Sequence, residues 1–123
     1  MLAVEAGDRA AWLGLFAPDA CVEDPIGPSM FDPEGAGHRG ADAIAAFYDA
    51  VIASGRVEFA IRESYAGGDE CANVGTITTT LPDGTRAIVD GVYTYRVDAA
   101  GRIVALRAYW EPDRMTLLPP PAG

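Results

Sequence analysis

The sequence predicts an α+β fold in which helices pack on one face of an antiparallel sheet. Within residues 41–53, apolar side chains recur at the i, i+3, i+4 and i+7 spacing of an amphipathic helix. From Val57 onward the pattern changes to strict alternation, with Val57, Phe59 and Ile61 on one face. Helices followed by a run of strands are typical of α+β domains. At 123 residues the chain suits one domain.

The first half of the chain contains short elements separated by turn residues. Gly7 suits the end of one helix near Ala6, and Asp8 suits the N-cap of a second helix over residues 9–16. Residues 20–26 are typical of a short strand, and the Gly- and Pro-rich residues 27–40 are expected to form a loop. Loops of that length often act as lids or binding loops.

The second half is expected to form a four-strand antiparallel meander. A turn at residues 66–69 separates the first strand from a second over 71–81, and Pro82-Asp83-Gly84 predicts a hairpin into a third over 86–97. A turn at 98–101 leads to a fourth strand over 102–110. We expect one domain over residues 1–117 and a disordered tail over 118–123.

Composition excludes several classes of protein. The net charge is −9 and the nine arginines are dispersed, which argues against nucleic-acid binding. No apolar run approaches the roughly 18 residues of a membrane span, and a signal-peptide pattern is absent, so we expect a cytoplasmic protein that does not bind membranes. Cys21 and Cys71 form no metal pattern with His38, and free thiols are expected over a disulfide. No phosphate loop or nucleophile elbow occurs.

Asp24 is the residue whose position is chemically unusual. In a strand over residues 20–26 it shares one face with Ala20, Val22 and Ile26. A carboxylate on an apolar face is costly when charged, and desolvation raises its pKa toward that of a useful general base. The alternative is that Asp24 accepts backbone hydrogen bonds near the Pro25 turn.

Residues 21–27, Cys-Val-Glu-Asp-Pro-Ile-Gly, resemble the VEDPFG-type segment of ketosteroid isomerases, in which the Asp moves a proton between steroid carbons. Residues 44–48, 98–103 and 108–110 resemble the second helix and last hairpin of that family. The resemblance spans residues 4–117. It implies the cone-shaped NTF2-like (SnoaL-like) fold, a curved sheet wrapped by helices around a pocket, with homodimers formed through the sheets.

The function implied by this resemblance is steroid Δ-isomerisation without a cofactor or metal. Asp24 is expected to shuttle the proton of a 3-oxo-Δ5-steroid or a similar hydrophobic polycyclic ketone. Two other functions fit the same cone: a polyketide cyclase of the SnoaL type, and a non-catalytic steroid- or lipid-binding protein.

The sequence departs from the family where the enolate oxygen is held. These isomerases use a first-helix Tyr and a protonated strand Asp as donors. The Tyr position falls just before Met1, so we expect an N-terminally shortened chain or a true loss of that Tyr. The Asp position holds Tyr93, which shares one face of the expected 86–97 strand with Val89, Tyr95 and Val97, and this face is expected to line the pocket. Tyr93 either donates to the oxyanion or is a core aromatic.

Further ligand contacts are expected on the same basis. Tyr48 matches a family Tyr, and Trp110 matches a pocket-lining Trp, although core packing would explain either. Val22 and Phe47 are candidate contacts beside them. His38 is a minor acid–base candidate or a surface residue. Within the long loop, Met30 and Phe31 are placed to fold over the pocket mouth.

Overall fold

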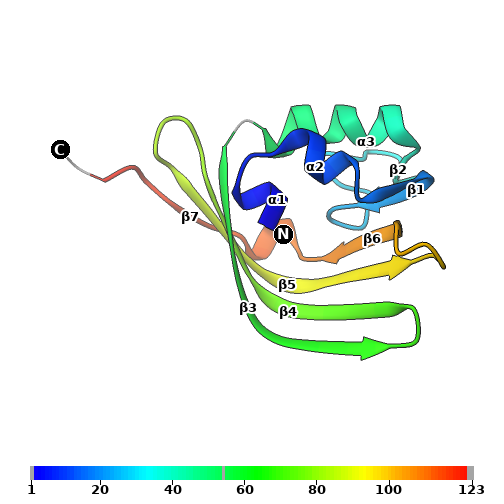
Figure 1. Cartoon of the computed structure of the whole chain (residues 1–123). Coiled ribbons are helices and arrows are strands. Elements are labelled where there is room, and N and C mark those ends of the chain that lie inside the picture. Colours follow the sequence, from blue (N-terminus) through cyan, green and yellow to red (C-terminus); the bar gives the residue numbers. More distant parts are fainter. Residues whose placement is uncertain (1, 54, 122–123) are drawn as a thin grey trace.

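A computed structural model describes residues 2–53 and 55–121 of the chain (Figure 1). The helical elements are α1 (Leu2–Glu5), α2 (Arg9–Leu13), α3 (Ala41–Phe47), a π-helical turn η1 (Tyr48–Ile52) and a 3₁₀ turn η2 (Pro112–Arg114). The strands are β1 (Phe16–Glu23), β2 (His38–Arg39), β3 (Arg56–Gly67), β4 (Glu70–Thr80), β5 (Arg86–Val97), β6 (Ile103–Tyr109) and β7 (Thr116–Leu118).

The strands form a single curved sheet. Its order is β2-β1-β6-β5-β4-β3, and β7 pairs with the part of β5 that β6 does not cover. All neighbours are antiparallel except β1 and β6, which run parallel. Figure 1 shows the helices on the concave side of the bent sheet. The predicted α+β class, with helices on one face of a mainly antiparallel sheet, is confirmed.

Two glycines face each other within the long strands β4 and β5. Gly75 of β4 and Gly91 of β5 are directly opposite each other. A Cβ on Gly75 would lie 2.5 Å from the carbonyl oxygen of Ala60, and one on Gly91 would lie 2.6 Å from that of Tyr109. Glycine inside a strand commonly marks a bend or a close backbone approach. The two residues therefore allow the backbones of β3 and of the end of β6 to approach more closely than a side chain would permit.

The start of the chain differs from the predicted elements. Asp8 is the N-cap of α2, and its carboxylate accepts the Ala11 N–H at 3.0 Å as expected. The helix ends at Leu13, however, and Phe16 begins β1, because Phe16 pairs with Ile103 of β6. Tertiary pairing has overridden local helical character here.

The first strand is also displaced. The predicted strand over residues 20–26 is β1, which begins at Phe16 and ends before Asp24. Pro25 cannot donate to a strand ladder, which accounts for the early end. The loop over 27–40 is shorter than predicted, because His38 and Arg39 form β2 against Val22 and Cys21.

The core lies between the sheet and the helices. Trp12 of α2, Val22 of β1, and Ile44 and Phe47 of α3 are each no more than 4% exposed and form one apolar cluster. Both cysteines are free thiols, and Cys21 is buried. Among the described residues, no helix is long and apolar enough to cross a membrane.

The chain end carries a strand that was not predicted. In β7, Leu118 pairs with Arg86 and Thr116 pairs with Ile88. Of the tail expected over 118–123, Pro120 lies beside Gly84, where an added Cβ would come within 3.2 Å of it. Residues 122 and 123 lie outside the described residues.

Candidate active site

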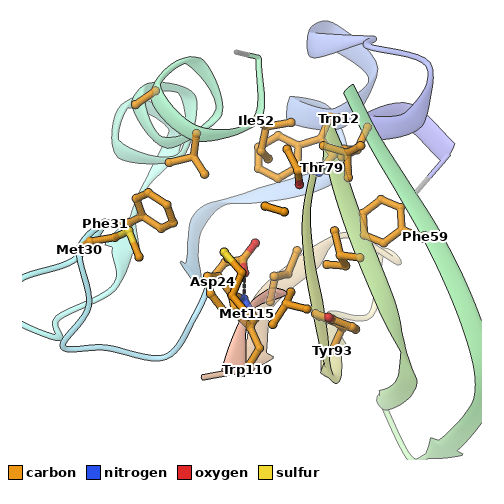
Figure 2. Close-up of a pocket in the computed structure, with 18 of the residues that line it drawn as sticks. Trp12, Asp24, Met30, Phe31, Ile52, Phe59, Thr79, Tyr93, Trp110 and Met115 are labelled. Atoms are coloured by element: carbon orange, nitrogen blue, oxygen red, sulfur yellow. Dashed lines mark hydrogen bonds between the residues drawn. The ribbon is translucent and has the colours of Figure 1, made fainter. Parts of the chain in front are cut away.

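One apolar cavity of about 410 Å³ lies between the concave sheet face and the helices. That volume falls in the range of about 300–1,000 Å³ that is common for small-molecule sites. Apart from two tryptophans, side-chain nitrogen and oxygen atoms in its wall belong to Asp24, Thr79, Tyr93 and Tyr95. Figure 2 shows Asp24, Trp110 and Tyr93 together on one side of the cavity and Thr79 on the other. The cavity suits a large apolar ligand with few polar groups.

Asp24 reaches the cavity because its backbone is tied to β6. The last residue of β1, Glu23, pairs with Arg107, and the Ile26 N–H donates to the carbonyl of Ala108 at 3.0 Å. This pairing places Asp24 next to Trp110, the residue that follows β6. The indole Nε1–H of Trp110 donates to Oδ1 of Asp24 at 2.7 Å (Figure 2). A strong hydrogen bond thus fixes the carboxylate at the cavity wall.

The surroundings of Asp24 raise the pKa of its carboxyl above the usual value. Desolvation by burial is the largest cause, while the Trp110 hydrogen bond and the positive charge that His38 can carry act in the opposite direction. Burial disfavours the charged carboxylate, whereas a donor stabilises it. Asp24 therefore combines greater basicity with a fixed orientation, as a general base requires.

Tyr93 lies on β5 in the wall of the same cavity and is only 3% exposed. Its hydroxyl is buried and has no hydrogen-bond partner among the described residues. Burial, followed by the negative charge of Asp24, raises the pKa of the phenol, which keeps it protonated as a donor. Buried polar groups are almost always paired, so this hydroxyl lacks a partner that a ligand oxygen could supply.

Three of the predicted ligand contacts do not line the cavity. Val22, Phe47 and Tyr48 belong to the core cluster and are each no more than 3% exposed. The ring of Tyr48 packs on Trp12, with ring centroids 5.2 Å apart. The core interpretation of Tyr48, which the sequence left open, agrees with this placement.

His38 lies in β2, outside the cavity wall. Its ring packs on Phe47 with centroids 4.7 Å apart, and it is not among the lining residues. Its Nε2 is buried without a hydrogen-bond partner among the described residues. His38 is thus partly buried and lies outside the cavity wall.

The long loop supplies one wall of the cavity. Met30 and Phe31 line it, and Met30 is 64% exposed at its edge (Figure 2). Asp32 shapes this loop, since its carboxylate accepts the N–H groups of Ala36 at 3.2 Å and Gly37 at 2.7 Å. The expectation that Met30 and Phe31 reach the pocket mouth fits this arrangement.

Tyr95 and Thr79 are polar lining residues that were not singled out from the sequence. Tyr95 shares the inward face of β5 with Tyr93, and burial followed by the charge of Asp24 raises the pKa of Tyr95 to about 12. The alternation of β5 already placed Tyr95 on this face. Thr79 gave no comparable signal, because it sits in a run of three threonines.

Comparison with known proteins agrees with this geometry. Residues 1–106 match the SnoaL-like domain family. The chain is 33% identical over 117 residues to the steroid Delta-isomerase of Nocardioides simplex, covering 95% of this chain and 88% of that protein.

Solved structures show the same likeness. The Δ5-3-ketosteroid isomerase from a Mycobacterium species is 44% identical with a TM-score of 0.91, covering 95% of this chain and 91% of that one. The Mycobacterium tuberculosis protein RV0760c, solved with estradiol-17β-hemisuccinate, is 40% identical with a TM-score of 0.88, covering 94% and 90%.

These matches span most of the chain and most of each relative. The chain belongs to the SnoaL-like, or NTF2-like, domain family, within the group that contains the ketosteroid isomerases. The resemblance inferred from the sequence is thereby confirmed.

Replacing Trp110 by Phe should raise the pKa of Asp24 further. The substitution removes the N–H that stabilises the carboxylate and keeps an aromatic ring in the cavity wall. Carbon-13 NMR titration of the Asp24 carboxyl measures the shift. The matched control is Trp12→Phe, which alters another lining tryptophan that does not bind Asp24 and should leave this pKa unchanged. An unchanged or lowered pKa in Trp110→Phe would mean that the indole does not stabilise the charge.

Proposed function

We propose that the protein is a cofactor-independent isomerase that moves a double bond in a 3-oxo-Δ5-steroid or a similar polycyclic ketone. One observation carries the proposal: a carboxylate of raised pKa and a buried, unpartnered phenol share the wall of one apolar cavity. The first is suited to accept a proton from carbon and the second to donate to the oxygen that becomes negative.

The reaction follows from these two groups. The Asp24 carboxylate takes a proton from the carbon between the carbonyl and the double bond, and the C–H electron pair forms the enolate. The Tyr93 hydroxyl donates to the enolate oxygen. Collapse of the enolate shifts the double bond into conjugation, and the far carbon of the original double bond takes the proton back from Asp24. Atoms and electrons balance without an oxidant.

The relatives support the substrate class. Two of them are named as steroid or ketosteroid isomerases, and RV0760c was solved with a steroid derivative. The wall of the cavity is mostly apolar, and such a wall suits a fused-ring compound that has few polar groups. Trp110 provides a flat aromatic surface at the end where Asp24 lies.

A non-catalytic steroid- or lipid-binding protein is the main alternative. It is favoured by Tyr93, because a phenol is a weaker acid than the carboxylic acid expected at that position, and burial weakens it further. A SnoaL-type polyketide cyclase also remains an alternative on the shared fold.

Turnover of 5-androstene-3,17-dione, followed by absorbance of the conjugated enone, tests the proposal. Asp24→Asn should lower kcat by at least about 100-fold, since a general base contributes roughly 10²–10⁴. For the wild type, kcat/KM should rise with pH as Asp24 ionises, with a midpoint above the ordinary Asp pKa of about 4 because burial raises it.

Two tyrosine variants complete this experiment. Tyr93→Phe should lower kcat by roughly tenfold or more with little loss of binding, because the hydroxyl acts where charge develops. Tyr65→Phe is the control, since Tyr65 is 60% exposed and does not line the cavity. Binding of the steroid without turnover would support the non-catalytic binding protein in place of the isomerase. If the protein neither bound nor converted the steroid, a steroid ligand would be rejected.

We also propose that the protein forms a homodimer through the convex sheet face. On β5 this face carries Ile88 and Val92, which are partly buried, beside the exposed Asp90. Asp90 accepts from Thr76 and pairs with Arg62 at 3.7 Å, so its charge is balanced within the face. Apolar groups mixed with paired charges are typical of an interface.

Light scattering at tens of micromolar should give twice the mass of the chain. Val92→Glu, which puts an unpaired charge in the middle of this face, should shift the protein toward monomer. Glu70→Gln, at the exposed start of β4, is a control that should leave the mass unchanged. A monomeric wild type would contradict the proposal.

A further inference from the structure

Thr79 and Tyr95 are the polar lining residues that the reaction above does not use, and Thr79 lies far from Asp24 and Tyr93. It lies near the end of β4, next to the hairpin, and lines the cavity. Its hydroxyl makes no hydrogen bond with another described residue. Its methyl faces Gly55, where an added Cβ would lie 3.2 Å from Cγ2. Figure 2 shows the hydroxyl oxygen of Thr79 directed toward the cavity.

Thr79 cannot contact the same ligand group as Tyr93. The strand partner of Thr79 is Ala87, six residues from Tyr93 along β5. At about 3.3 Å per residue this is roughly 20 Å of extended strand, shortened by the bend. Asp24 and Tyr93 hold one end of a ligand, and Thr79 faces the other.

The wall around Thr79 is apolar. Its neighbours on the inward face of β4 and the strands beside it are Val57, Ile77 and Ala87, all of which line the cavity. A single hydroxyl in an apolar wall orients a ligand by one specific hydrogen bond. A ligand that is apolar throughout would leave it without a partner when bound.

We infer that Thr79 is a specificity residue whose hydroxyl binds a second oxygen substituent, a carbonyl or hydroxyl, at the end of the ligand remote from its enolisable carbonyl. This inference rests on the proposed function for the ligand class. It narrows that class to fused-ring ketones that are polar at both ends.

Equilibrium binding of two ligands tests the inference without requiring turnover. The ligands are 4-androstene-3,17-dione and 4-androsten-3-one, which lacks the remote oxygen, and binding is followed by tryptophan fluorescence. Thr79→Val keeps the branched shape and removes the hydroxyl. It should weaken binding of the dione by about threefold to tenfold, the net effect of one neutral hydrogen bond, and leave the mono-ketone unchanged.

Thr78→Val is the matched control, because Thr78 is the adjacent residue on the opposite sheet face and does not line the cavity. It should change neither affinity. Equal effects of Thr79→Val on both ligands, or no effect on the dione, would overturn the inference, as would failure of both ligands to bind. A Thr79-dependent preference without turnover of the Δ5 substrate would keep the inference and reject the isomerase. Turnover of the Δ5 substrate without a Thr79-dependent preference for the dione would keep the isomerase and reject the inference about Thr79.

Discussion

The apolar, partly buried surroundings of the Asp24 carboxylate are the constraint on which the site depends. Burial raises its pKa, and the Trp110 indole, at 2.7 Å, supplies the donor that offsets part of this effect. A carboxylate with no donor would stay protonated over a wide pH range, and one in full contact with water would be a weak base. The same apolar wall that raises the basicity of Asp24 also suits the ligand. One physical cause thus serves both binding and proton transfer.

The curvature of the sheet creates that wall. Gly75 and Gly91 lie opposite each other in β4 and β5, and neither position has room for a Cβ, as is common where strands bend or approach closely. Beyond Gly91, the inward-facing residues of β5 become aromatic, with Tyr93 and Tyr95 in the cavity wall. Parallel pairing of β1 with β6 then brings Asp24 to the same end. The two groups proposed to share the reaction therefore come from opposite halves of the sequence.

Much of this arrangement was predictable, because it follows from side-chain alternation along single strands. Alternation placed Asp24 with Val22 and put Tyr93 on the inward face of β5. Neither strand alternation nor helical periodicity could distinguish a buried residue that packs against other side chains from one that borders a cavity. Phe47 was therefore expected to contact ligand and Tyr48 was left open between ligand contact and core, and both lie in the core. Val22 was likewise expected to contact ligand and packs in the core instead.

The remaining features depend on contacts between distant parts of the chain. The Trp110–Asp24 hydrogen bond joins residues 86 positions apart, and it exists because β1 joins the sheet beside β6. Local pattern carries no information about that neighbour. The boundaries of β1 shifted for the same reason, since Phe16 is held by Ile103 and not by the preceding helix. Alternation separates Thr79 from the threonines beside it, but only the folded structure shows that its face of β4 borders the cavity.

The most direct test of the account is the pH dependence of the difference in unfolding free energy between Asp24→Asn and the wild type. Asparagine keeps an oxygen for the Trp110 N–H and carries no charge. Because the folded pKa of Asp24 is raised, the wild type loses stability as pH rises from the unfolded value of about 3.9 through the folded value. The account predicts that Asp24→Asn is the more stable protein at pH 7, that its advantage shrinks as pH falls through the folded pKa toward about 3.9, and that the difference levels off below that pH. A wild type as stable as the variant at pH 7, or a difference that does not change with pH, would contradict it.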